Sequence, residues 1–319
     1  MRMKSRLKKA MFSHQGLLVM ITIITYLVFF LVSPNFAKIT NLYTILRTMC
    51  IVSILALGVT FVITLGEIDL SIETLPGLCA AVFCYLIEAK AAFLSALLAA
   101  LACCLLVGLI NGLVIVKTKL PSIVITLATG MIVGGLTEIV TAHRAIVISL
   151  KSFTDMINFR IGNFPGIAIW MLLFVVIAYI IMHKTKLGRY LELTGDNREA
   201  SRYAGLNDRL YYLIAFLICA TFCFLGGMMG VSISSNATPD MLRNYQMTAI
   251  TATVIGGTDM NGGKASILGT IIGAFFLSTV ENGFLIVGIQ QWVLYLVNGV
   301  VIMLTLALKE TLQHSRGIQ

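Results

Sequence analysis

The chain has 319 residues, of which 58% are hydrophobic and only 12% are charged, whereas a soluble domain is nearer 25% charged. Its mean hydropathy is +0.95, and long uncharged apolar runs recur along it, which excludes an ordinary soluble domain and indicates an all-α polytopic membrane protein. The runs are continuous rather than alternating, which excludes a transmembrane barrel. The net charge of +9 comes from Lys and Arg scattered between apolar runs, as in membrane-protein loops, and gives no sign of nucleic-acid binding.

The basic start, "MRMKSRLKK", precedes an apolar run that is too long for a signal peptide and has no small-residue cleavage site. We therefore expect a single transmembrane domain over 1–319, which includes a cytoplasmic tail over 1–15 and a second cytoplasmic tail over 309–319. About ten membrane spans are predicted, two of them conspicuously short, near residues 16–33, 43–65, 70–87, 91–116, 121–142, 166–183, 210–231, 245–258, 265–287 and 291–308.

The distribution of Lys and Arg predicts the orientation of these spans. If the N-terminus is cytoplasmic and the spans alternate, the inner segments hold sixteen basic residues and the outer segments seven. Cytoplasmic loops carry the excess of Lys and Arg. Both termini are therefore predicted to be cytoplasmic.

The third predicted span begins beside an unusual cluster, "GEIDLSIE" (66–73), which holds Glu67, Asp69 and Glu73. Only 14 uncharged residues follow before Glu88, or about 21 Å of helix, which is short of a ~30 Å hydrocarbon core. A carboxylate facing lipid costs roughly 2.5–3.5 kcal/mol. Either Glu73 enters the membrane zone or the segment is a helix broken at depth, and the Pro76-Gly77 pair suits a break or kink. The alternatives are an interfacial loop with solvated carboxylates, and Asp69 as the N-cap of the third span.

Small residues and cysteines recur within the apolar runs. Glycine pairs four residues apart predict close helix packing inside one bundle, or alternatively a dimer seam; they are Gly108/Gly112, Gly130/Gly134, Gly226/Gly230 and Gly269/Gly273. The seven cysteines have no metal-ligand spacing, so we interpret them as small core residues and predict no metal site.

The charged segment 184–209 differs from the rest of the chain. Asp196 can cap a helix, with Glu199 in capping-box spacing, and Gly205 can end it. The pattern predicts a helix of about two turns over 197–204. A helix this short is marginal alone in water, so we expect a partner surface, the alternative being a solvated connector.

A second short span, 245–258, ends in "GGTDMNGG" (256–263), and its "GGTDMN" aligns with "GEIDLS" as Gly, any, any, Asp, apolar, small polar. Matching interruptions in two halves of a chain favour a transport pathway. Glu281 is the sole charged residue between Lys264 and Lys309. We interpret it as a candidate pathway residue, and the alternative is a carboxylate near the outer interface.

These stretches resemble one family, the permease subunits of ribose-type ABC importers, which includes permeases for other sugars and for autoinducer-2. "GEIDLS" resembles its Gly-Gly-Ile-Asp-Leu-Ser block, and "VIGGTDMNGGKASILGTIIGA" (254–274) resembles its most specific signature. "GLINGLVI" (108–115), "LPSIVITLAT" (120–129) and "TGDNREASRYAGL" (194–206) also resemble family blocks. The resemblance runs in order over about 40–308.

The resemblance implies a function and site residues. It implies an importer permease without an ATPase site of its own, ATP being bound by a cytoplasmic ATPase, with no cofactor in this chain. It further implies a second permease chain, a solute-binding protein outside and a location in the bacterial inner membrane. The ATPase-coupling residues it implies are Gly195, Asp196, Asn197, Glu199, Ala200 and Gly205. The predicted pathway residues are Glu67, Asp69, Glu73, Asn111, Gly256, Gly257, Asp259, Glu281 and Asn282.

Three positions depart from the family pattern. Glu67 and Glu73 stand where the family favours Gly, and Glu281 stands where Asn is common. These carboxylates leave the solute open among pentoses, hexoses and autoinducer-2, with a nucleoside as the alternative. A proton-coupled secondary transporter is the alternative from another class, because intramembrane carboxylates can relay protons.

Overall fold

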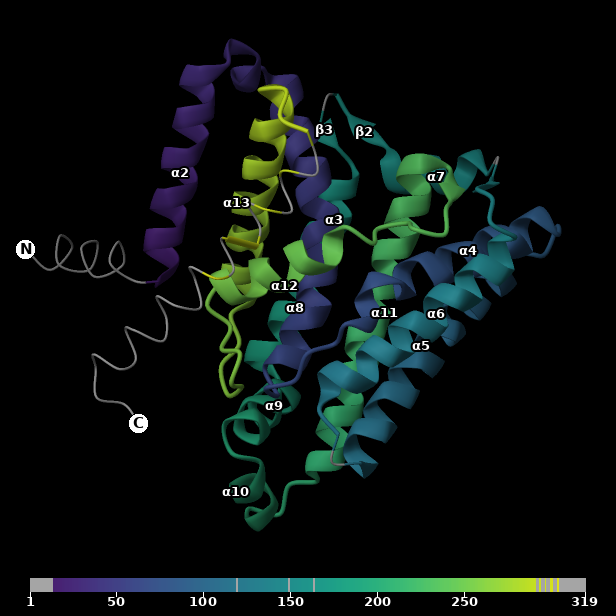
Figure 1. The fold of residues 1–319 in the computed structure, drawn as a ribbon, viewed down its shortest axis with the longest axis vertical. Helices are drawn as coiled ribbons and strands as arrows, with labels where there is room; N and C mark the ends of the chain where they lie inside the picture. Colours follow the sequence, from purple (N-terminus) through teal and green to yellow (C-terminus); the bar gives the residue numbers. More distant parts are fainter. Residues whose placement is uncertain are drawn as a thin grey trace, which may run out of the picture.

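The structure is a computed structural model of the chain. It describes residues 14–118, 120–148, 150–162, 164–290, 293, 296, 299, 300 and 303. The element order is helical almost throughout, with short strand pairs at one end (Figure 1). The chain is therefore a polytopic helical protein, as the apolar runs predict.

Among the described residues, seven helices are long and apolar enough to cross a membrane. They are α2 (His14–Val32), α3 (Ile39–Ile63), α5 (Phe93–Lys117), α6 (Ser122–Thr141), α8 (Ile167–Lys184), α11 (Asp208–Ser234) and α13 (Ile267–Ile286). Two further helices, α4 (Leu75–Glu88) and α12 (Tyr245–Ile255), have 14 and 11 residues and match the two predicted short spans. The tenth predicted span, 291–308, falls largely outside the described residues, so the count of ten stays a prediction.

Small elements lie at the two ends of the helix bundle (Figure 1). One end carries η1 (Pro34–Ala37), α7 (Lys151–Asn158) and two strand pairs. In these, β1 (Ile146–Val147) pairs antiparallel with β4 (Asn236–Ala237), and β2 (Arg160–Ile161) pairs with β3 (Phe164–Pro165). The other end carries α9 (Lys186–Asp196) and α10 (Arg198–Tyr203). The sequence predicts that this second end is cytoplasmic.

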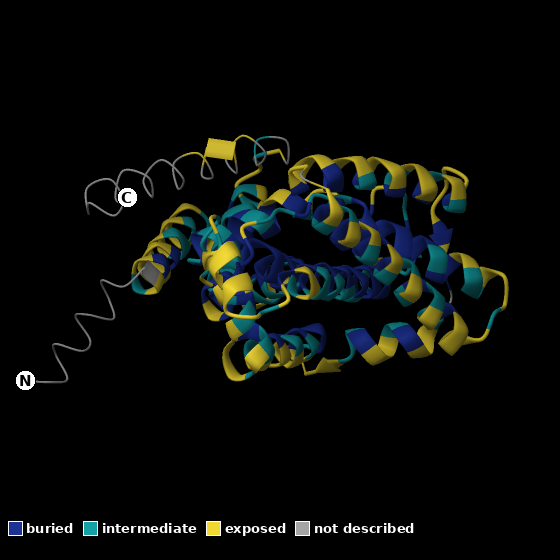
Figure 2. Cartoon of the chain, turned by 90° about the horizontal axis from the view of Figure 1, so that it is seen from below, coloured by how far each residue is buried: buried dark blue, intermediate teal, exposed yellow. Residues whose placement is uncertain are grey.

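Helices α3 and α11 form the centre of the bundle. In its most apolar 18-residue stretch, α3 is 83% buried and α11 is 72% buried, whereas α2 is only 11% buried. Figure 2 shows the same division, with dark blue central helices and outer helices that are yellow on their outward faces. Because lipid surrounds such a bundle, apolar side chains cover its outside as well as its core.

Glycine lets the central helices approach closely. A Cβ added at Gly58 of α3 would lie 2.8 Å from Phe222 Cβ, and one at Gly108 of α5 would lie 2.7 Å from Ala220 Cβ. The four predicted glycine pairs likewise pack against other segments of this chain, Gly273 for example against Ala252. Packing inside one bundle therefore explains these pairs. Six of the seven cysteines are buried and all seven are free, as the core interpretation predicts.

The third predicted span is broken, which was one of its two interpretations. After α3 the chain runs without regular helix to η2 (Ser71–Glu73), and α4 begins only at Leu75, with Pro76 in its first turn. The second short helix is interrupted differently. Strand β4 and the turns that follow it, up to residue 244, precede α12, whereas "GGTDMNGG" follows it and α13 is of full length. The two stretches share only a local turn, in which Asp69 and Asp259 each accept a hydrogen bond from the N–H two residues later.

Candidate functional site

Asp69 lies in the protein interior, with 2% of its surface exposed. Its Oδ1 accepts hydrogen bonds from the Ser71 backbone N–H (2.9 Å) and from the Ser71 hydroxyl (2.6 Å). The Ser71 hydroxyl oxygen accepts a third from Asn111 Nδ2 on α5 (3.0 Å). Two predicted pathway residues, Asp69 and Asn111, are thus joined through Ser71. For Asp69, both alternatives from the sequence are wrong, because the carboxylate is not solvated and α4 is preceded by Thr74.

Side chains from neighbouring helices satisfy the irregular backbone before α4. The Ile68 N–H donates to Ser122 Oγ (3.1 Å) and the Leu70 N–H donates to Thr126 Oγ1 (3.0 Å). The Leu70 carbonyl accepts from Gln246 Nε2 on α12 (3.0 Å). Non-helical backbone at membrane depth needs such partners. Sequence reasoning missed these residues, although Ser122 and Thr126 lie in the family block at 120–129.

Glu73 forms an ion pair that the sequence did not predict. Arg243 Nε lies 3.2 Å from Glu73 Oε1, and the two side chains are 50% and 34% exposed. The sequence assigned Arg243 to an outer loop. In the structure Arg243 lies two residues before α12 and reaches the segment before α4. The available signal was the shortness of the 245–258 span, which places its start at depth.

The short helix α10 is formed by its two caps. Asn197 is the N-cap, and its Oδ1 accepts from the Ala200 N–H (2.9 Å). The prediction that Asp196 caps this helix was wrong, since Asp196 is the last residue of α9. Gly205 ends the helix as expected, with φ +81°. Its N–H and that of Leu206 bond back to Arg202 and Ser201 carbonyls, the pattern of a Schellman motif.

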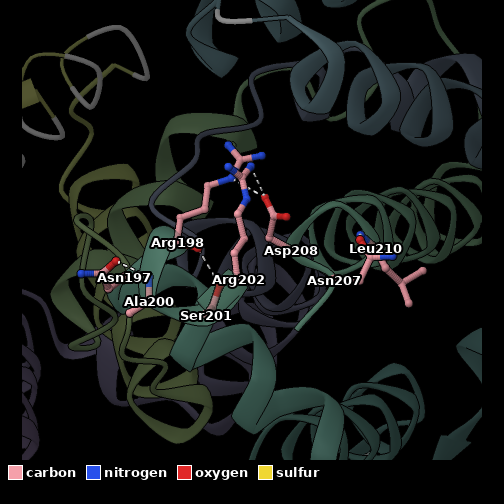
Figure 3. A network of polar contacts seen from close by, with 8 residues as sticks. All are labelled: Asn197, Arg198, Ala200, Ser201, Arg202, Asn207, Asp208 and Leu210. Carbon is pink, nitrogen blue, oxygen red and sulfur yellow. Dashed lines mark hydrogen bonds and ion pairs between the residues drawn. The ribbon is translucent and has the colours of Figure 1, made fainter. Parts of the chain in front are cut away.

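A network of arginines fixes α10 to the start of α11 (Figure 3). Arg198 Nε and Arg202 Nη2 each lie 2.7 Å from Asp208 Oδ2, and the Asp208 side chain is only 6% exposed. The hydrogen bond to Asp208 raises the pKa of Arg202 above its ordinary value. The Arg198 guanidinium also lies 4.2 Å from the centre of the Tyr212 ring. Sequence reasoning missed Arg198, Arg202 and Asp208, whose signal was opposite charges on either side of a turn.

Glu67 connects this network to the broken helix. Its half-buried carboxylate interacts with Tyr212. The ring of Tyr212 also makes the cation–π contact with Arg198. Glu67 lies two residues before Asp69, in the irregular stretch after α3. A continuous set of contacts therefore runs from α10 through Arg198 and Tyr212 to the segment that holds Asp69.

A second connection is made by glycines from three segments. A Cβ added at Gly195 of α9 would lie 1.9 Å from the Thr64 carbonyl oxygen, and one at Gly262 would lie 2.6 Å from the Gly195 oxygen. The Gly263 N–H donates to that same Thr64 oxygen (2.9 Å). Gly66, at the end of α3, has φ +75° and faces the Asn261 carbonyl. We call these residues, Thr64–Gly66, Gly195 and Asn261–Gly263, the glycine junction.

The loop after α12 is shaped by its own polar groups. The Asp259 carboxylate accepts from the Asn261 N–H (3.0 Å), and the Asp259 N–H donates to the Lys264 carbonyl (3.0 Å). Gly257 has φ +98°, and Gly256 packs so closely on Gly269 that a Cβ would lie 2.4 Å from its carbonyl carbon. These predicted pathway residues therefore brace the joint between α12 and α13.

Glu281 and Asn282 make no hydrogen bond or ion pair with Asp69, Ser71 or Asn111 among the described residues. Both are on α13, which packs against α2, α3 and α12. The Asp69 segment contacts α5, α6 and α11, and it also contacts α12 through Gln246. Glu281 is partly buried and interacts with Tyr245 at the start of α12. Asn282 is 8% exposed. The structure thus does not bring the nine predicted pathway residues into one site.

Within the part of the chain that the structure describes, no group of three or more His, Cys, Asp or Glu side chains could hold a metal ion. The polar clusters are built instead from hydrogen bonds and ion pairs between helices.

Comparison with known proteins identifies the family. The family model described as branched-chain amino acid transport system, permease component, matches residues 41–306. The ribose import permease protein RbsC of Escherichia coli K12 is 33% identical over 91% of this chain and 90% of its own. That of Bacillus subtilis 168 is 31% identical over 92% and 90%.

More distant relatives have other solutes in their names. The galactose/methyl galactoside import permease protein MglC of Escherichia coli K12 is 27% identical over 94% of this chain and 95% of its own. The autoinducer 2 import system permease protein LsrD of Klebsiella pneumoniae is 28% identical over 98% and 96%. No solved structure matches the chain significantly. The resemblance seen in the sequence blocks is confirmed, and the chain belongs to the family of ABC importer permease components that also contains the ribose import permeases.

Proposed function

We propose that the chain is the transmembrane permease subunit of an ATP-driven, binding-protein-dependent importer for a sugar or a sugar-like solute. Its relatives are named for the import of ribose, L-arabinose, galactose and autoinducer 2. These solutes are small and rich in hydroxyl groups. Ribose is the first solute to test, because the ribose permeases share the highest identities given above.

The observation that carries the proposal is α10. It is a capped helix held at the extreme end of the molecule (Figure 1), and among the described elements it packs mainly against its neighbours α9 and α11. Several of its residues are exposed, including Glu199, Ala200 and Tyr203, the last with 92% of its surface exposed. A short helix held rigidly at its base but free on its outer face is suited to insertion into a partner protein.

The proposed partner is a cytoplasmic ABC ATPase that grips α10. Its movements would reach the membrane helices by the two connections described above, one through Tyr212 to the Asp69 segment and one through the glycine junction to α3. Packed elements with discrete arrangements transmit such shifts between sites. The ATPase binds the ATP, so this chain contributes motion and a path.

The remaining features of the proposed complex follow the same reasoning. A second permease chain, identical or different, completes the path, and a solute-binding protein delivers the solute from outside. The subunit lies in the bacterial inner membrane with about ten spans and with both termini in the cytoplasm, as the distribution of Lys and Arg favours.

The test reconstitutes the chain with its ATPase and binding protein in liposomes and measures uptake of radiolabelled D-ribose. Glu199→Arg places a bulky charge of opposite sign on the docking face, and Gly205→Pro removes the N–H that closes α10 and forbids its positive φ. Both are expected to abolish ATP-driven uptake while membrane insertion is unchanged. Arg189→Gln, an exposed change on α9, is the control.

Two outcomes would contradict the proposal. Normal uptake by Glu199→Arg and Gly205→Pro would remove the docking role of α10. Uptake by the isolated chain, driven by a pH gradient without any ATPase, would establish a proton-coupled transporter instead.

A further inference from the structure

The ion pair between Glu73 and Arg243 lies near the middle of the membrane. Arg243 Nη2 is 3.8 Å from the position that a Cβ on Gly134 would occupy. Gly134 lies twelve residues beyond Ser122, where α6 begins, and α6 has 20 residues. At 1.5 Å per residue, the pair is about 18 Å from one end of a helix about 30 Å long. Its depth thus corresponds to the hydrocarbon region.

Both members of the pair are accessible at this depth in the single chain. The Arg243 and Glu73 side chains are 50% and 34% exposed, in contrast to Asp69, which is 2% exposed. The other ion pairs in the described part of the chain lie at helix ends, as between Arg144 and Glu88. Charged groups at membrane depth face the bundle interior or a water-filled cavity. An exposed pair at mid-depth therefore calls for water on that face.

The two short helices converge on the same place. Glu73 lies two residues before Leu75, where α4 begins, and Arg243 lies two residues before Tyr245, where α12 begins. The segments are also tied by Gln246, whose Nε2 donates to the Leu70 carbonyl. Discontinuous helices that begin near the bilayer midplane are where transporters build solute sites. The pair therefore marks a junction of two broken helices and not an isolated surface contact.

We infer that the Glu73–Arg243 pair lines the aqueous translocation path and acts as its specificity-determining contact for a neutral, hydroxyl-rich solute. This inference rests on the proposed function for its solute. A carboxylate accepts and a guanidinium donates hydrogen bonds, so together they complement adjacent hydroxyl groups. The pair has no net charge and gives no advantage to an ionic solute. Arg243 is a residue that the family blocks in the sequence do not include.

Water access is tested first, without any solute. The chain is assembled in membranes with its partner subunits, and Asn244→Cys is introduced. Asn244 is exposed and lies next to Arg243, so this change leaves the ion pair intact. A charged, water-soluble methanethiosulfonate reagent is then applied from each side. The control is Val176→Cys, in the middle of α8 and 47% exposed. Asn244→Cys is expected to react at least tenfold faster than Val176→Cys, and Arg243→Cys should behave like Asn244→Cys.

Equal and slow reaction at positions 244, 243 and 176 would overturn the inference, because the pair would then face lipid or a dry interface. This result is independent of the proposed function, which fails only if the ATPase does not bind or drive uptake. The two failures are therefore distinguishable.

The specificity role is tested by uptake in the reconstituted complex with labelled D-ribose. Glu73→Gln and Arg243→Gln are each expected to lower the initial uptake rate at least tenfold while ATPase binding is unchanged. The double exchange, Glu73→Arg with Arg243→Glu, should recover part of the loss, because it restores the pair. Uptake by both single variants within twofold of the original chain would overturn the specificity role, even if the site is wet.

Discussion

Arg198 of α10 and Asp208 of α11 form an ion pair of 2.7 Å across the turn that separates the two helices. The Asp208 side chain is 6% exposed and Arg198 is 33% exposed, so the pair is largely shielded from solvent. Arg202 makes a second bond to the same oxygen, Asp208 Oδ2. One carboxylate therefore ties two residues of α10 to the start of α11.

We predict that Asp208→Asn loosens α10 without unfolding the membrane domain. The change removes the charge on which both arginines rely, and hydrogen bonds to charged groups are worth about 1.5–3 kcal/mol each. Solute imported per ATP hydrolysed should fall, because part of the movement of α10 would no longer reach α11. The measurement is parallel uptake and phosphate release in liposomes. Unchanged stoichiometry would show that the network is dispensable for coupling.

Tyr203 is expected to anchor α10 in its partner. It is 92% exposed, and exposed aromatic residues commonly supply much of the binding energy at protein interfaces. Tyr203→Ala should weaken co-purification with the ATPase by at least ~2 kcal/mol, or roughly thirtyfold in affinity. Tyr190→Ala, at an aromatic contact with Tyr211 on the neighbouring segment, is the comparison. Equal retention of the ATPase by both variants would place the interface elsewhere.

The glycine junction should tolerate no added methyl group. In Gly195→Ala, the new Cβ would lie 1.9 Å from the Thr64 carbonyl oxygen, so α9 must shift away from α3. Core overpacking typically costs 1–3 kcal/mol, and we expect a lower thermal midpoint in detergent and poorer coupling. Gly135→Ala is the matched control, because nothing lies within 4 Å of its added Cβ. Equal thermal midpoints for the two variants would contradict the tight packing of the glycine junction.

The orientation of the bundle can be tested at two exposed lysines, Lys151 of α7 and Lys186 of α9. Lys151→Cys should react with an impermeant maleimide applied outside intact cells, whereas Lys186→Cys should react only after the membrane is opened. The excess of Lys and Arg in the predicted cytoplasmic loops is the physical reason. The reverse labelling pattern would invert the proposed topology.

Apolar run length was sufficient to predict most of the fold. The two short runs correspond to α4 and α12, because hydrophobic length fixes how far a helix can extend across the bilayer. Run length could not predict the direction of the break at α12. That break depends on residues 235–244, which enter the bundle with mixed polarity and therefore resemble an outer loop.

The candidate site was only partly predictable. Asp69 and Gly205 were identified because carboxylates at the start of an apolar run and a glycine after a capped helix have strong local signals. Arg243 and Asp208 were missed because their roles depend on partners 170 and 10 residues away in the chain. Asp196 was predicted as the cap because Glu199 lies three residues later, in capping-box spacing, and α9, whose last residue is Asp196, was not expected.

Substitutions at Asp69 can distinguish its role as a hydrogen-bond acceptor in the fold from the role of its negative charge in transport. Its Oδ1 accepts both hydrogen bonds from Ser71, so Asp69→Ala leaves two buried donors unsatisfied. Each such donor costs about 1–3 kcal/mol, and we expect strongly reduced folded yield and no measurable uptake. Asp69→Asn retains an acceptor oxygen and should keep the fold, yet impair uptake more than Glu67→Gly, which alters only a half-buried contact with Tyr212. Folded yield by gel filtration and D-ribose uptake are measured together. If Asp69→Asn and Glu67→Gly both behaved like the original chain, the contacts from α10 to the broken helix would have no part in transport.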